Sequence, residues 1–165
     1  MTTRVMPAQR PGRSEQSVGT PDAFLCAVAA RFGGLSWDLA ADKTNHVTAG
    51  WFGPGSPYQE DSFSANWRML AGLCWLNPPY GEIGKWAEKC AAETGPDLPS
   101  PARVALLVPA SVGTNWFAAY VDKKALVLFL SPRLTFVGHT QSYPKDLMLC
   151  MYGDTPGYEC WRWRP

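Results

Sequence analysis

The sequence lacks several features that would assign it to a class at once. It contains no apolar run near the ~20 residues that a membrane-spanning helix needs and no apolar signal-peptide region at its start. Neither sign of charge is in excess, because 15 Lys and Arg face 14 Asp and Glu for a net charge of +1. We therefore expect neither a membrane protein nor a histone-like polycation, and any contact with nucleic acid must come from a local patch.

Metal ligands and disulfide signals are also scarce. The chain has only two histidines, His46 and His139, and its five cysteines form no CxxC pair. This set offers few ligands for zinc, so we expect no metal. An odd number of cysteines, most of them in apolar segments, indicates reduced structural thiols in a cytoplasmic protein.

Aromatic residues, Pro and Gly are abundant instead. Eight tryptophans are many for 165 residues, and 15 Pro with 15 Gly indicate many turns and loops. The length fits one domain with a substantial core. Aromatic side chains mostly build such cores, but a surplus beside Pro-rich loops also suits a site that stacks flat rings.

The chain divides near residue 20. Residues 1–19 are polar and lack periodicity, which predicts a flexible arm, either a solvated tail or one that trails along DNA. Residues 20–165 form the predicted folded domain. It begins with a helix that the Thr20 hydroxyl caps, with Pro21 at its first position, and Gly33-Gly34 end that helix.

Apolar runs then alternate with amphipathic helices, which predicts an α/β domain with a largely parallel central sheet flanked by helices. Residues 42–66 contain no clear element, and such a long irregular stretch indicates a functional loop. The tail at 161–164 is either an edge strand or a loose end. The predicted strands are 35–40 (ending at Asp38), 73–76, 104–108, 126–130, 134–137 and 147–151, and the predicted helices are 82–93 and 115–121.

The tetrapeptide Asn77-Pro78-Pro79-Tyr80 directly follows the predicted strand 73–76. In open α/β sheets, ligands bind beyond the carboxyl ends of the strands. Two consecutive prolines fix the backbone and donate no hydrogen bonds, so this corner presents carbonyl oxygens without competing N–H groups. Asn77 adds an amide oxygen, and Tyr80 adds a planar face.

A flat ring that bears an amino group fits this corner. Its NH₂ can donate one hydrogen to the Asn77 side-chain oxygen and the other to the Pro78 carbonyl while Tyr80 stacks on the ring. These acceptors pull the nitrogen out of conjugation and direct its lone pair at an electrophile, without a strong base. The alternative interpretation is a plain Pro-Pro turn after a strand.

The tetrapeptide resembles that of amino-group methyltransferases that use S-adenosylmethionine (SAM). More narrowly, the chain is similar to the small phage-type DNA N6-adenine methyltransferases of the Dam family, in order from residue 20 to about 151. The resemblance implies a Rossmann-like SAM-dependent methyltransferase fold. It also implies methyl transfer to N6 of an adenine flipped out of double-stranded DNA, in the cytoplasm of a bacterium or phage-infected cell. The other matching stretches are 32–41, Asn45, 61–63, Trp67, 106–109, 115–117 and 133–136.

The resemblance also implies which residues bind SAM. The Thr20-Pro21 pair matches the segment against the methionine end, although a helix N-terminus explains it equally well. Asp38 and Ala40 match the SAM loop, where Asp38 could instead cap a turn. Asp61 matches the acid that accepts from the cofactor's adenine amino group, beside Ser62 and Phe63, or it is a solvated loop residue. The SAM loop, residues 38–43, lacks the glycines that many SAM enzymes have there.

For the DNA substrate, the resemblance points to Ser111, Asn115 and Trp116 as base-pocket residues, although Trp116 fits a core position equally well. Arg133 is the expected phosphate contact. Other basic residues that could touch phosphates, or simply be solvated, are Lys123, Lys124 and Lys145. His46 and His139 are interpreted as loop residues and not as catalysts.

Two alternatives to DNA methylation stay open at this stage. The same tetrapeptide serves methyl transfer to an RNA base or to a protein glutamine amide, since the corner does not separate a purine amine from an amide. Those enzymes usually carry a Gly-rich SAM loop and extra domains. The other alternative is a non-catalytic nucleic-acid-binding module on the same fold. The sequence fixes neither a recognised DNA sequence nor an oligomeric state.

Overall fold

The computed structural model describes residues 18–164, so most of the arm expected at 1–19 lies outside the described residues. Within them, one sheet has the strand order β2-β1-β3-β4-β6-β5-β7. The strands are β1 (Leu35–Asp38), β2 (Gly50–Trp51), β3 (Leu73–Leu76), β4 (Arg103–Pro109), β5 (Ala125–Ser131), β6 (Leu147–Tyr152) and β7 (Gly157–Arg162). The α-helices are α1 (Asp22–Phe32), α2 (Ile83–Thr94) and α3 (Asn115–Tyr120), and short 3₁₀ turns are η1 (Ser62–Ser64), η2 (Trp67–Met69) and η3 (Tyr80–Glu82).

The described sheet is mostly parallel, as predicted. Strand β6 pairs antiparallel with both β4 and β5, and every other pairing is parallel. The C-terminal tail forms the edge strand β7 beside β5. From β1 the chain moves outward to β2 and then returns to place β3 on the other side of β1. This reversal creates a topological switch point between β1 and β3, the place where open α/β sheets bind ligands.

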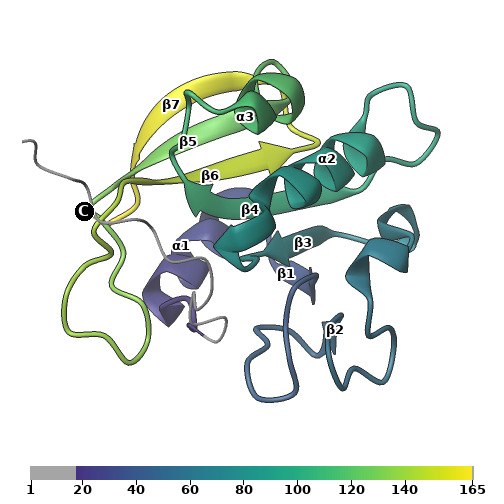
Figure 1. The fold of residues 1–165 in the computed structure, drawn as a ribbon, viewed down its shortest axis with the longest axis horizontal. Coiled ribbons are helices and arrows are strands. Elements are labelled where there is room, and N and C mark those ends of the chain that lie inside the picture. The colour runs from purple at the N-terminus through teal and green to yellow at the C-terminus, as the bar shows by residue number, and fades with distance from the viewer. Residues whose placement is uncertain (1–17, 165) are drawn as a thin grey trace, which may run out of the picture.

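Helices cover both faces of the sheet. Helix α1 lies across one face, and α2 with α3 lies across the other (Figure 1). Successive side chains of β3 point to opposite faces, so Trp75 packs in the cluster that contains Phe24 of α1, whereas Cys74 packs in the cluster that contains Trp86 of α2. Burial of β3 on both faces explains its unbroken apolar sequence.

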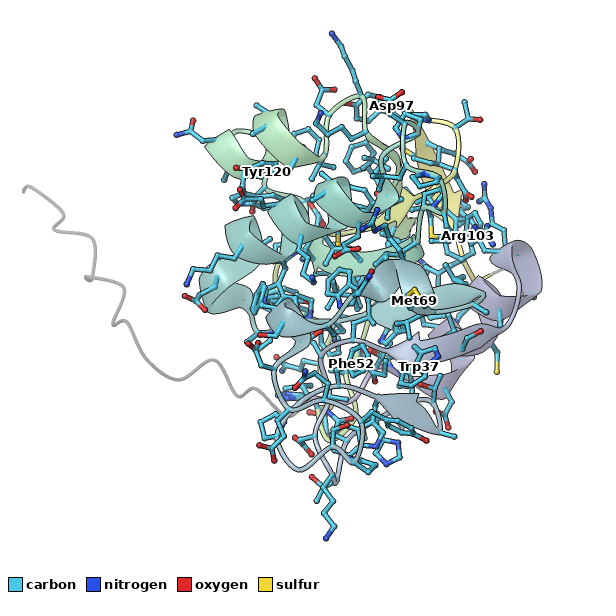
Figure 2. The ribbon with its side chains drawn as sticks, turned by 90° about the vertical axis from the view of Figure 1, so that its right-hand side faces the viewer. Trp37, Phe52, Met69, Asp97, Arg103 and Tyr120 are labelled. Atoms are coloured by element: carbon cyan, nitrogen blue, oxygen red, sulfur yellow. The ribbon has the colours of Figure 1, made fainter. Side chains whose placement is uncertain are left out.

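Most of the tryptophans are structural. Five of them, Trp51, Trp67, Trp75, Trp86 and Trp163, are buried. At the β1–β2 edge, Trp37 lies beside Phe52 with ring centroids 5.2 Å apart (Figure 2). The aromatic surplus therefore mainly fills the core and its margins.

Three expectations for the backbone are wrong. Residues 134–137 form no strand; Leu134 and Phe136 are buried in a loop, so their apolar character reflects packing and not pairing. The short strand β2 lies inside the stretch without a predicted element, because two residues leave no periodicity to detect. Thr20 does not cap α1: Pro21 holds the N-cap position, with no side-chain cap hydrogen bond.

Phe24 provides a test of the α1 packing. This fully buried ring lies 6.3 Å from the Trp75 ring and 5.2 Å from the Trp163 ring. Phe24→Ala leaves a cavity between α1 and the sheet, and we expect it to lower the free energy of unfolding by about 3–5 kcal/mol. Met69→Ala, at a side chain that is 80% exposed, is the control and should change it by less than about 0.5 kcal/mol. Urea denaturation measures both, and equal effects would contradict the described packing.

Candidate active site

The carboxyl ends of β1 and β3 meet at the switch point. In their parallel register Asp38 pairs with Trp75, so Asn77 follows just beyond. A cavity of about 620 Å³ opens there. It gathers residues from both strand ends and from the segment before α1: Thr20, Asp38, Ala40, Asn77, Pro78, Pro79 and Tyr80 all line it. The structure thus brings the tetrapeptide together with three of the predicted cofactor residues.

The Asn77 carboxamide is held at both ends. Its Nδ2 donates to Thr20 Oγ1 at 3.2 Å, and the Tyr80 hydroxyl donates to its Oδ1 at 3.3 Å. The amide oxygen therefore lies on the side of Tyr80, while the amide nitrogen faces Thr20. A carboxamide oxygen has two lone pairs, so Oδ1 keeps one for a further donor.

Tyr80 is a neutral aromatic wall of the cavity. Burial raises the pKa of its phenol well above the ordinary value, with Tyr143 as a smaller cause, so the hydroxyl stays protonated and donates. The Tyr80 ring meets the Tyr143 ring edge-on at 6.0 Å, and Tyr143 in turn meets Phe136 at 5.6 Å. These contacts fix the orientation of the Tyr80 ring.

Asp38 is a buried carboxyl group in the wall of the cavity, with only 4% of its surface exposed. Its oxygens accept from the backbone N–H of Val47 at 3.0 Å and of Ala40 at 3.3 Å. Burial raises the pKa of Asp38 to about 6, against the opposing effect of these two hydrogen bonds. Asp38 therefore fixes the turn after β1. A cation bound beside it would lower its pKa and favour the ionised carboxylate.

A second hollow of about 270 Å³ adjoins the first, and Ala40, Asn45 and Pro79 line both. Asp61, Ser62 and Phe63 line it, and the Phe63 ring lies 4.2 Å from the Trp86 ring. The Ser62 hydroxyl is buried and has no hydrogen-bond partner within the described part of the chain. An unpaired buried hydroxyl is unusual and suits a ligand that completes its bonding.

Asp61 also has a local structural role. Its oxygens accept from the Phe63 N–H at 3.0 Å and from the Ser64 hydroxyl at 2.5 Å, and these bonds cap η1. The Ser64 bond is the largest cause that lowers the pKa of this exposed carboxyl group. Asp61 therefore stays ionised, with lone pairs left for a further donor.

One wall of the first cavity was missed by the sequence analysis. The loop between β5 and β6 supplies Phe136, His139, Gln141, Ser142, Tyr143 and Pro144. A long connection at the ligand-binding edge is itself a signal of function. The false strand at 134–137 hid that signal, because it divided the loop into shorter pieces.

The predicted substrate residues lie elsewhere. Among the described residues, Ser111, Asn115, Trp116 and Arg133 line neither hollow. Trp116 is partly buried and packs against the core cluster that contains Trp86 of α2, and Arg133 pairs with Asp146 at 2.9 Å. Lys123, Lys124 and Lys145 are exposed. Contact of these residues with DNA stays a prediction.

Other classes of site are not found in the described residues. No group of three or more His, Cys, Asp or Glu among residues 18–164 is placed to hold a metal ion. All five cysteines are free thiols, and Cys74, Cys90 and Cys150 are buried. Of the described helices, none has the length and apolar character to cross a bilayer.

The mostly parallel sheet and the Asn-Pro-Pro-Tyr corner at its switch point are consistent with a Rossmann-like methyltransferase fold. The chain belongs to the Dam family, because the family model described as DNA N-6-adenine-methyltransferase (Dam) matches residues 10–147. This confirms the resemblance drawn from the sequence, and at family level the protein is a DNA adenine methyltransferase. Searches of curated proteins and of solved structures returned no match.

The burial of Asp38 predicts a pH dependence of stability. The folded protein holds this proton up to a pH of about 6, whereas the ordinary pKa is 3.8. Between these values the folded state binds more protons than the unfolded chain, so stability falls as pH rises. The protonated Asp38 adds roughly 3 kcal/mol to the free energy of unfolding at low pH, below the ordinary pKa of the group. This stabilisation is lost as the pH rises through about 6.

Asp38→Asn removes this titration. We expect the unfolding free energy of the wild type to fall relative to that of the variant by about 2 kcal/mol from pH 4 to pH 6.5, as followed by urea denaturation. Taking the difference cancels the other carboxyl groups, whose titrations the two proteins share. A difference that stays constant across this range would contradict the burial of an ionisable Asp38.

Proposed function

We propose that this protein transfers a methyl group from SAM to N6 of an adenine flipped out of double-stranded DNA. The observation that carries the proposal is the Asn77 corner, whose amide oxygen lies beside Tyr80 at a cavity that also contains the buried Asp38. The family assignment supplies the class of substrate.

The residues of the corner act directly on the amino group. Asn77 Oδ1 accepts one N–H hydrogen, and the Pro78 carbonyl accepts the other. Both prolines lack an N–H donor, so no backbone group competes for these oxygens. The two bonds draw the nitrogen lone pair out of the ring and hold it toward the methyl donor. As the bond from nitrogen to the methyl carbon forms, the bond from that carbon to the sulfonium sulfur would break and leave a neutral thioether, and the nitrogen would lose its proton to water.

The two adjoining hollows fit SAM. Asp38 and Ala40 would hold one part of SAM in the first hollow, and Asp61, Ser62 and Phe63 the other part in the second. The buried Ser62 hydroxyl, which has no hydrogen-bond partner within the described residues, would bond to the cofactor there. When bound, SAM supplies an electrophilic methyl group on a sulfonium.

The loop after β1 reaches its tight packing without glycines of its own. Gly53 supplies the close approach from the facing segment: a Cβ there would lie 1.8 Å from the Ala41 carbonyl oxygen, and its φ is +142°. Only glycine tolerates both conditions. The missing Gly-rich loop is therefore compatible with a SAM site.

The aromatic residues beside the corner suit a flipped base. Tyr80 offers its ring as a stacking face, while Tyr143 and Phe136 border the same cavity from the β5–β6 loop. A base enters such a pocket only after leaving the duplex stack, and aromatic contact offsets part of the cost of unstacking. Because the proposed substrate is cellular or phage DNA, we expect the protein to act in the cytoplasm.

Each rival function predicts a different result when the methyl group of SAM is labelled. The corner alone would also accept an RNA base or a glutamine amide, and a retired site would bind SAM without transfer. Incubation with SAM labelled in its methyl group, in the presence of duplex DNA, RNA or a protein extract, separates these cases. We expect label in DNA, recovered as N6-methyladenine by mass spectrometry. Label only in RNA or protein, or SAM binding without transfer, would overturn the proposal.

Asn77→Ala tests the corner. Loss of one acceptor should remove about 2–4 kcal/mol of transition-state stabilisation, a fall in kcat of roughly 30- to 1000-fold, while SAM affinity changes little. Asp97→Ala is a control because Asp97 lies near the top of the view in Figure 2, far from Phe52, a lining residue of the second hollow. Single-turnover methylation and calorimetric SAM binding give the two quantities. An Asn77→Ala activity within a few-fold of the control would contradict the assigned role.

Tyr80 tests the stacking face. Tyr80→Ala should weaken capture of the flipped base by about 1–3 kcal/mol. Tyr80→Phe keeps the ring and loses only a long hydrogen bond to Asn77, so its effect should be milder. Fluorescence of a base analogue at the target position reports capture. If both variants weaken base capture equally, the Tyr80 hydroxyl, and not its ring, would be the group that matters.

A further inference from the structure

Thr20 lines the first cavity, where the resemblance places a cofactor contact, but its side chain also contacts Asn77, and it does not cap α1. Thr20 is buried, with only 5% of the residue's surface exposed, and its hydroxyl oxygen accepts from Asn77 Nδ2 at 3.2 Å. The two residues are 57 positions apart in the sequence. The Thr20 hydroxyl therefore contacts the tetrapeptide directly.

The backbone around Thr20 is anchored on both sides. The Gly19 carbonyl accepts from the Val137 N–H at 2.9 Å, and the Pro21 carbonyl accepts from the Phe24 N–H at 2.9 Å in the first turn of α1. Thr20 thus sits between a helix and the β5–β6 loop that borders the cavity. Because both neighbouring residues are hydrogen-bonded, the backbone that carries the Thr20 hydroxyl is held in place without relying on Asn77.

The orientation of the Asn77 amide decides whether the corner works. Its oxygen and nitrogen are nearly equal in size, so rotation by half a turn exchanges an acceptor for a donor with little change in shape. An amino group needs the acceptor. A buried NH₂ without a partner is costly, so loss of the Thr20 oxygen would favour the turned amide, against the opposing hydrogen bond from the Tyr80 hydroxyl to Oδ1.

We propose that Thr20 is a positioning residue that fixes the Asn77 carboxamide with its oxygen toward the substrate amino group. The proposal rests on the function proposed above. It differs from a cofactor contact, which Thr20 could also make from the cavity wall. A positioning role lowers the rate of methyl transfer, whereas a cofactor contact lowers the affinity for SAM.

Thr20→Val and Thr20→Ser form the matched pair. Valine keeps the shape but removes the acceptor, and serine keeps the acceptor. We expect Thr20→Val to lower kcat on duplex DNA at saturating SAM by about tenfold or more and to change the Kd for SAM by less than about twofold. Thr20→Ser should stay within about threefold of the wild type in both. If Thr20→Val does not fold, Thr20→Ala takes its place with the same expected split.

A double-mutant cycle separates positioning from a general structural effect. In the Asn77→Ala background there is no amide to orient, so adding Thr20→Val should lower kcat by less than about twofold. An equal loss in both backgrounds would overturn the proposal. A weakened Kd for SAM with unchanged kcat would also overturn it, in favour of a cofactor contact.

A measurement independent of activity keeps this proposal distinct from the proposed function. In ¹⁵N-labelled protein, the Asn77 side-chain NH₂, assigned by its loss in Asn77→Ala, should exchange its hydrogens faster in Thr20→Val than in the wild type or Thr20→Ser. Unchanged exchange would refute the Thr20–Asn77 bond. If the wild type methylates no substrate but exchange rises as expected, the function fails while the bond stands.

Discussion

The site depends on one carboxamide group held in one orientation. Asn77 directs its oxygen toward Tyr80 and its nitrogen toward Thr20, at a corner whose two prolines contribute no N–H donors. Such a corner suits a group that donates two hydrogen bonds from one atom, as an aromatic amine does. The lack of N–H groups at Pro78 and Pro79 thus matters to the proposed chemistry as much as the oxygen atoms of the corner do.

The sheet makes this corner possible. Strand β3 is buried on both faces, so its end is rigid, and the reversal of strand order beside it leaves space at the carboxyl edge. The parallel register places Asp38 beside Trp75 and thereby sets a buried carboxyl group near the amide. Helix α1 does more than cover a face, since the segment leading into it delivers Thr20 to Asn77.

The sequence predicted what local patterns encode. The apolar run of β3 and the tetrapeptide after it were located to the residue, since burial and proline leave strong signals. Non-local arrangements were beyond reach: the Thr20–Asn77 bond joins distant segments, and no pattern in residues 18–21 announces it. The β5–β6 loop was mistaken in part for a strand, because buried loop residues such as Leu134 are as apolar as paired ones. The raised pKa of Asp38 likewise arises only from burial in the finished fold.

The most direct test is a crystal structure of the protein with a SAM analogue and a DNA duplex that contains adenine. The account predicts the adenine N6 within ~3 Å of both Asn77 Oδ1 and the Pro78 carbonyl oxygen, stacked on Tyr80 and facing the analogue's sulfonium position. An analogue bound away from this corner, or an Asn77 amide whose nitrogen faces the base, would contradict it.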